Sequence, residues 1–115
     1  MKLSEIATLL DAKILCCEDS ISYEVFSAFG SDMMSDVLAF VRNQAVLLTG
    51  LINPQVIRTA MMMDLKCIVF VRNKQPSEEM IELAKEAGIV LLATGKRLYD
   101  ASGILYSNGL RESEV

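Results

Sequence analysis

Three short, almost entirely apolar runs, each followed by a helix-like segment, most constrain how this chain can fold. The runs cover residues 45–49, 67–71 and 89–93, and the predicted helices cover residues 54–64, 77–87 and 96–107. Strands that are apolar on both sides are typical of a parallel sheet whose two faces are covered by helices. The second half of the chain therefore predicts an α/β fold with a mainly parallel sheet.

The first half of the chain adds two further strands to this prediction. A helix capped by Ser4 and ending near residues 11–12 comes first, then a strand over residues 13–17 and a turn over residues 18–20. Residues 23–29 alternate loosely and predict another strand, which Gly30 ends. The sequence thus predicts a single domain over residues 1–110, with about five strands and helices on both faces of the sheet, and a flexible tail over residues 111–115.

Residues 30–41 predict a helix that carries two carboxylates. Its apolar face is formed by Met33, Met34, Val37, Leu38 and Val41. Asp32 and Asp36 would stand one turn apart on the opposite face. Helix capping accounts for Asp32, and Asp36 fits a solvated position. A catalytic carboxylate pair or a metal site is the alternative, although two carboxylates without a third ligand are a weak metal signal.

Chemical signals mark the helices of the second half of the chain. Asn53 suits the N-cap of the helix that starts at Pro54, Pro76 opens the next helix, and Gly88 can adopt the left-handed conformation that ends it. The methionines at positions 62–63 fall outside the predicted apolar stripe of their helix, which fits an oligomer surface. Because 52% of the residues are apolar, we also expect a homodimer.

The residue composition narrows the chemistry of the chain. Histidine is absent, which removes the commonest general base and the usual partner of a Ser or Cys nucleophile. A P-loop is not formed, since Val90 and Arg97 stand where that motif needs Gly and Ser or Thr. Cys16, Cys17 and Cys67 lack CxxC spacing, which favours reduced thiols over a metal or redox site. We therefore expect no catalytic site, metal or cofactor.

Charge and hydropathy exclude two classes of partner. The formal net charge of -4 and the pI near 4.8 argue against nucleic acid, because binding phosphates requires a basic face. No run reaches the roughly 18 to 20 apolar residues of a membrane span, and the first residues lack the layout of a signal peptide. We therefore expect a cytoplasmic protein with neither a nucleic-acid nor a membrane partner.

Polar and charged residues gather in the loops that follow the predicted parallel strands. In such sheets small ligands bind beyond the carboxyl ends of the strands, where helix N-termini offer free N–H groups. Four of the chain's 11 Lys and Arg residues fall in two of these loops; we call Arg72, Lys74, Lys96 and Arg97 the cationic rim. The rim predicts a site for an anion such as a phosphate group, with simple solvation of these side chains as the alternative. The predicted ligand-binding residues are Ser31, Asp32, Ser35, Asp36, Thr49, Asn53, Arg72, Asn73, Lys74, Thr94, Lys96 and Arg97.

Five segments spread along the chain are informative when they are taken as a set: KLSEI at 2–6, GSDMMSDV at 30–37, PSEE at 76–79, EAGIVLL at 86–92 and LYDASG at 98–103. Together they resemble the DRTGG domain family, in particular its short stand-alone bacterial members. The family is similar to the N-terminal domain of HPr kinase/phosphorylase. The resemblance implies an α/β domain with a regulatory or ligand-sensing role, and it does not imply kinase activity, because the catalytic domain of that kinase has no counterpart in this sequence.

The chain departs from the motif that names the family. GLIN at 50–53 stands where its Asp-Arg would follow a strand, and FVRN at 70–73 stands where its Thr-Gly-Gly would be. The block from Ser31 to Asp36 carries over residue by residue. We therefore expect a non-catalytic regulatory domain that recognises a small anionic ligand. A protein–protein interaction module without a small ligand is the first alternative, and an enzyme using Asp32 and Asp36 is the second.

Overall fold

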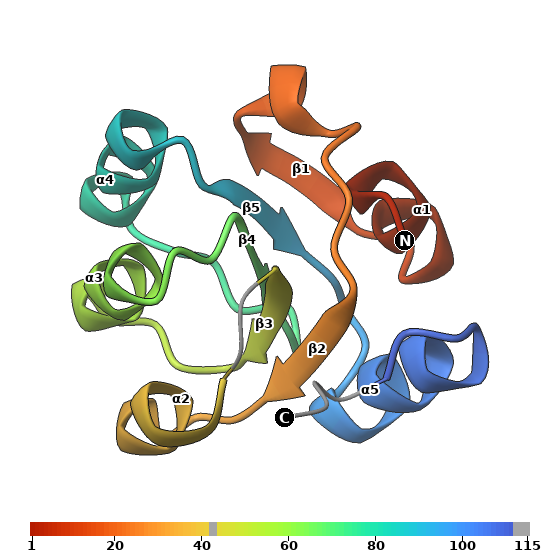
Figure 1. Cartoon of the computed structure of the whole chain (residues 1–115). Coiled ribbons are helices and arrows are strands. Elements are labelled where there is room, and N and C mark those ends of the chain that lie inside the picture. The colour runs from red at the N-terminus through yellow and green to blue at the C-terminus, as the bar shows by residue number, and fades with distance from the viewer. Residues whose placement is uncertain (42–43, 112–115) are drawn as a thin grey trace.

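The computed structural model describes residues 1–41 and 44–111, which form five strands and five α-helices (Figure 1). In chain order these are α1 (Leu3–Leu9), β1 (Lys13–Cys16), β2 (Ser27–Gly30), α2 (Met34–Phe40), β3 (Ala45–Thr49), α3 (Pro54–Met62), β4 (Cys67–Phe70), α4 (Glu78–Ala87), β5 (Val90–Ala93) and α5 (Leu98–Ser107). The turn predicted at residues 18–20 forms a short 3-10 helix. Within the described ranges, every helix is too short or too polar to cross a membrane.

All five strands lie in one sheet in the order β1-β5-β4-β3-β2. β2, β3, β4 and β5 run parallel to one another, and β1 pairs antiparallel with β5. The predicted mainly parallel five-stranded sheet is therefore confirmed. Because four neighbouring strands point the same way, the loops that follow them all leave the sheet at one edge, which we call the carboxyl edge.

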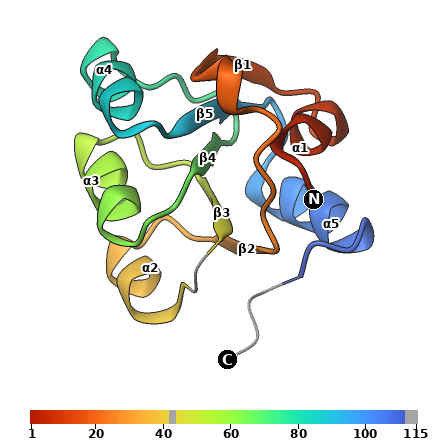
Figure 2. The same ribbon diagram turned by 45° about the horizontal axis from the view of Figure 1, so that its top comes forward.

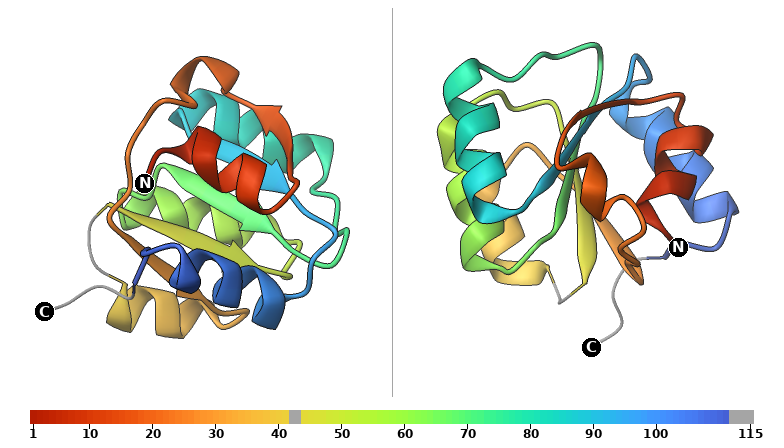
Figure 3. Two further views of the ribbon diagram at one scale, coloured as in Figure 1. Left: turned by 90° about the vertical axis from the view of Figure 1, so that its right-hand side faces the viewer. Right: turned by 90° about the horizontal axis from the view of Figure 1, so that it is seen from above.

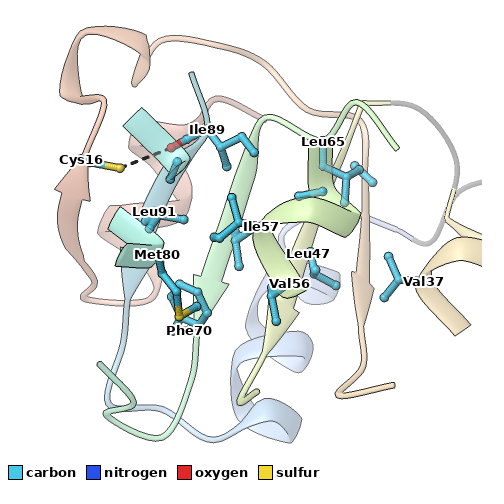
Figure 4. Close-up of a cluster of buried hydrophobic side chains, with 14 of the residues drawn as sticks. Cys16, Val37, Leu47, Val56, Ile57, Leu65, Phe70, Met80, Ile89 and Leu91 are labelled. Atoms are coloured by element: carbon cyan, nitrogen blue, oxygen red, sulfur yellow. Dashed lines mark hydrogen bonds between the residues drawn. The ribbon is translucent and has the colours of Figure 1, made fainter. Parts of the chain in front are cut away.

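Helices cover both faces of the sheet, as predicted. Figures 2 and 3 show α2, α3 and α4 on one face and α1 and α5 on the other. Successive side chains of a strand point to opposite faces, so β2, β3, β4 and β5 contribute side chains to both cores. The core under α2, α3 and α4 includes Ile68, together with Leu47, Phe70 and Leu91 (Figure 4). The core under α1 and α5 includes Val46, Leu48, Val69 and Leu92.

Local chemistry fixes the two helices that follow β3 and β4. Asn53 caps α3 by accepting a hydrogen bond from the N–H of Gln55 at 2.8 Å, and Pro54 occupies the first helical position. Ser77 caps α4, so the helix begins two residues after Pro76. Gly88 ends α4 with a φ of +72°, as predicted.

Before α2, the structure differs from the prediction at α1 and at β2. Ser4 lies inside α1, and the helix start is closed by Glu5, whose carboxylate accepts the N–H of Lys2 at 3.0 Å. β2 begins at residue 27 rather than 23, and it includes Gly30. Residues 23–25 pair with the start of the chain, where Val25 donates its N–H to the carbonyl of Met1 at 2.8 Å, and Phe26 donates its N–H to the carbonyl of Gln44 at 2.9 Å.

The structure also bears on the predictions for the methionines at the end of α3 and for the C-terminal tail. α3 ends at Met62, so the exposed pair is Met61 and Met62, whereas Met63 packs against the core. The predicted surface position is therefore confirmed for Met62 and wrong for Met63. Of the predicted tail, Arg111 accepts a hydrogen bond from the N–H of Ala28 at 3.0 Å, beside the outer edge of β2. Residues 112–115 lie outside the described residues.

Candidate functional site

Two backbone hydrogen bonds join the loops that follow β4 and β5. Arg72 donates its N–H to the carbonyl of Lys96 at 2.8 Å, and Asn73 donates to the carbonyl of Thr94 at 3.0 Å. Arg72 and Asn73 both adopt the left-handed conformation, with φ of +60° and +58°. This is an uncommon backbone state for residues other than glycine, and it turns the chain sharply toward the β5 loop. The two loops that carry the cationic rim are therefore held side by side.

The carboxylate of Asp32 ties β2 to β3 across the carboxyl edge. Its Oδ1 atom accepts the N–H of Gly50 at 2.7 Å and the hydroxyl of Thr49 at 3.0 Å. The helix α2 begins only at residue 34, so Asp32 neither caps it nor shares a helical ridge with Asp36, which lies exposed on α2. The predicted arrangement of these two carboxylates is wrong. Asp32 instead binds the donors at the end of β3, namely the hydroxyl of Thr49 and the N–H of Gly50.

The other oxygen of Asp32 faces the guanidinium of Arg72. The distance from Nη2 of Arg72 to Oδ2 of Asp32 is 3.8 Å, and the two side chains are 47% and 49% exposed. The guanidinium lies directly on the backbone of Gly50, so that a Cβ atom at that position would collide with it. Gly50 therefore makes room for Arg72 beside Asp32.

Three glycines lie at the carboxyl edge: Gly30 is the last residue of β2, Gly50 directly follows β3, and Gly95 lies in the loop after β5. A Cβ atom at Gly30 would lie 3.1 Å from a methyl carbon of Leu98, and one at Gly95 would lie 3.0 Å from Oδ1 of Asn73. With Gly50, these residues let side chains from neighbouring elements rest on main chain. The sequence prediction did not include Gly50 or Gly95 among the site residues, although a glycine directly after a strand is a signal of close approach.

Thr49 and Thr94 are buried and have structural partners. Thr94 donates its hydroxyl to the carbonyl of Leu10 at 2.6 Å and accepts the N–H of Lys96 at 3.2 Å. Thr49 donates to Asp32 and accepts the N–H of Leu51 at 3.1 Å. Both hydroxyls therefore shape the loops of the carboxyl edge and are not free for a ligand.

The remaining predicted site residues lie around this centre. Ser31 accepts the N–H of Met33 at 2.9 Å, and Asn53 serves as the cap of α3. Ser35 lies exposed on α2. Of the cationic rim, Lys74 and Arg97 are exposed and Lys96 is half-buried. Hydrogen bonds and one ion pair thus bring together one group of the predicted residues, namely Asp32, Thr49, Arg72, Asn73, Thr94 and Lys96.

A shallow groove continues from the cationic rim along the outer side of α5. Lys96 lies at its start, and its lining includes Tyr99, Ile104, Tyr106 and Asn108. Tyr99 is 90% exposed. Lys96 and the exposed Tyr99 thus provide a positive charge and a flat apolar surface within one groove.

The two buried thiols, Cys16 and Cys67, show no sign of activation. Cys16 donates to the carbonyl of Ile89 at 3.4 Å, and burial raises its pKa to about 11 (Figure 4). Burial also raises the pKa of Cys67. A reactive thiol needs the opposite shift. Within residues 1–41 and 44–111, no group of three or more His, Cys, Asp or Glu residues could hold a metal ion.

A model of the DRTGG domain family matches residues 5–107. This chain belongs to the DRTGG domain family. The family assignment made from the sequence is thus confirmed. A comparison with curated proteins finds no significant match.

The fold of this DRTGG domain is similar to that of a larger regulatory assembly. The similar structure is a crystal structure of the CBS and DRTGG domains of the regulatory region of Clostridium perfringens pyrophosphatase, complexed with its activator, diadenosine tetraphosphate. The TM-score is 0.74 at 19% identity, over 90% of this chain and 45% of that one. At this identity the likeness shows the fold, and our chain spans less than half of the other chain.

Proposed function

We propose that this DRTGG domain is a regulatory, ligand-sensing domain that binds a small phosphate-containing anion at its carboxyl edge. The hydrogen bonds from Arg72 to Lys96 and from Asn73 to Thr94 carry the proposal. They gather the cationic rim in a chain whose net charge is -4. A local cationic group on an acidic protein concentrates anions at that point of the surface.

The charges at the rim leave cations available to a ligand. Arg72 pairs with Asp32. In the part of the chain that the structure describes, Lys74, Lys96 and Arg97 form no salt bridge. A unit charge at about 4 Å contributes roughly 1 kcal/mol in water and about 4 kcal/mol at the effective dielectric constant near a protein surface. Two or three such contacts would together contribute several kcal/mol to the attraction of a phosphate group.

The groove along α5 favours a nucleotide over inorganic phosphate. A phosphate group at Lys96 would place the rest of the ligand beside Tyr99, whose open ring can stack on a base. The activator in the similar structure, diadenosine tetraphosphate, combines these two chemical groups. We propose the same ligand class for this domain.

Calorimetric titration with ATP and with diadenosine tetraphosphate tests this proposal. We expect K96A/R97A to weaken binding at least tenfold, because it removes two rim cations. The control is K66A/K85A, which removes two lysines that precede β4 or end α4, at the opposite edge of the sheet. Equal binding by the two double variants, or no binding by the unaltered protein, would refute the proposal.

Exposed apolar residues favour protein–protein interaction as a second function. Phe40 on α2 is 62% exposed and Met62 on the neighbouring α3 is 71% exposed. Contiguous apolar patches are typical of surfaces that bind proteins, and these two residues lie on helices that pack against each other. The homodimer and the cytoplasmic location expected from the sequence stay predictions. Sedimentation velocity at micromolar concentration tests the homodimer, and M62E should shift a real dimer toward monomer.

A further inference from the structure

We propose that Asp32 competes with the anionic ligand for Arg72. In this arrangement, which we call the latch, the Asp32 carboxylate holds the Arg72 guanidinium against Gly50. A phosphate group that binds at the carboxyl edge draws Arg72 away from Asp32. The inference rests on the proposed function, because it assigns Arg72 to the same ligand.

The carboxylate side of the latch is fixed. Asp32 accepts hydrogen bonds from the Gly50 N–H at 2.7 Å and from the Thr49 hydroxyl at 3.0 Å. Thr49 is fully buried, and its hydroxyl also accepts the N–H of Leu51. Both donors stay on Oδ1 when Arg72 leaves. The oxygen that loses Arg72 is Oδ2, and the Asp32 side chain is 49% exposed, so water can solvate this oxygen when the latch opens.

The arginine side of the latch is free to move beyond its backbone. The N–H of Arg72 is bound to the Lys96 carbonyl at 2.8 Å, so the base of the side chain is anchored beside the β5 loop. The guanidinium itself is half-exposed and lies 3.8 Å from Asp32. An exposed pair at such a distance contributes little to stability. A phosphate can therefore compete for Arg72, and it offers the bidentate geometry that guanidinium prefers.

Gly50 provides the space in which the closed latch rests. Its missing side chain is what allows the guanidinium to lie on the backbone. G50A would fill this space, and the flexible end of Arg72 would have to move away while Asp32 stays in place. Two substitutions of different chemistry should therefore open the latch: D32N removes the carboxylate charge, and G50A fills the space in which the Arg72 guanidinium lies.

Calorimetric titration with inorganic pyrophosphate at low ionic strength tests the latch. We expect D32N to bind pyrophosphate at least fivefold tighter than the unaltered protein, since it frees Arg72 and removes a negative charge. Asn can still accept the N–H of Gly50, which keeps the loop in place. D36N is the matched control, because it removes the same charge from an exposed position on α2, and it should bind like the unaltered protein. The affinity gain of D32N should disappear in D32N/R72Q.

G50A gives an independent readout, and we expect it also to bind pyrophosphate more tightly. If the unaltered protein binds and neither D32N nor G50A binds more tightly, the latch is wrong while the proposed function stands. A gain in D32N that survives in D32N/R72Q would also overturn the latch, since Arg72 would then play no part. If neither the unaltered protein nor any variant binds pyrophosphate or a nucleotide, the latch and the proposed function both fail.

Discussion

The same substitution, Thr to Val, should have opposite effects at two buried positions of this domain. The hydroxyl of Thr94 joins the carbonyl of Leu10 and the N–H of Lys96, at 2.6 and 3.2 Å. The hydroxyl of Thr59 is equally buried, but it has no hydrogen-bond partner among the described residues. Val has nearly the same shape as Thr, so the comparison isolates the hydroxyl group.

T94V should lower the free energy of unfolding by about 2 to 3 kcal/mol. Each lost hydrogen bond costs about 1 kcal/mol, and the Leu10 carbonyl is left without this donor at a buried position. For a domain of this size the loss lowers the melting temperature by roughly 8 to 12 °C. T59V removes an unpaired buried polar group and should be neutral or stabilising by up to about 1 kcal/mol.

Urea denaturation followed by circular dichroism measures both values, and the slope m verifies that the unfolded states are comparable. T94S should retain most of the stability that T94V loses, because it keeps the hydroxyl. A T94V variant as stable as T59V would show that the bond to Leu10 does not contribute, and it would refute this account of the β5 loop.

Two further predictions concern backbone and thiols. G103A should raise the free energy of unfolding by about 0.5 to 1 kcal/mol by stabilising α5, and G88A should lower it by about 1 kcal/mol because of the positive φ at this position. Nothing lies within 4 Å of either new Cβ atom, so thermal unfolding of the two variants compares the backbone effects without new contacts. Native alkylation with mass spectrometry should label Cys17 before Cys16 and Cys67, which are buried. The raised pKa of Cys16 means that the unfolded chain ionises first, so stability should fall from about pH 9 toward about pH 11 in urea titrations.

The parallel part of the sheet could be predicted because its signals are local. Each central strand is apolar on both sides, and the caps at Asn53 and Gly88 lie next to the helices that they bound. The strand before Gly30 was misplaced because residues around Val25 pair with the chain start, a partner that alternation of side chains cannot reveal. Residues 23–25 and 27–30 are both extended, and only their hydrogen-bond partners determine that the second segment joins the sheet.

The candidate site could be predicted in its location but not in its contacts. Parallel strands fix which loops share an edge, and this rule alone placed Arg72 and Lys96 together. The roles of Asp32 and Thr94 depend on partners 17 to 84 positions away in sequence, namely Thr49, Gly50 and Leu10. No spacing rule connects residues over such distances, so helix capping was the nearest local explanation for Asp32.

The glycines at Gly30, Gly50 and Gly95 have a consequence for how such a domain can change its preference for a ligand. They make much of the carboxyl edge from peptide backbone, with side chains of other elements resting on it. The backbone of the carboxyl edge therefore does not depend on which charged side chains lie over it. A related chain could exchange one rim cation for another residue and acquire a new selectivity, while the strands and their order remain as they are.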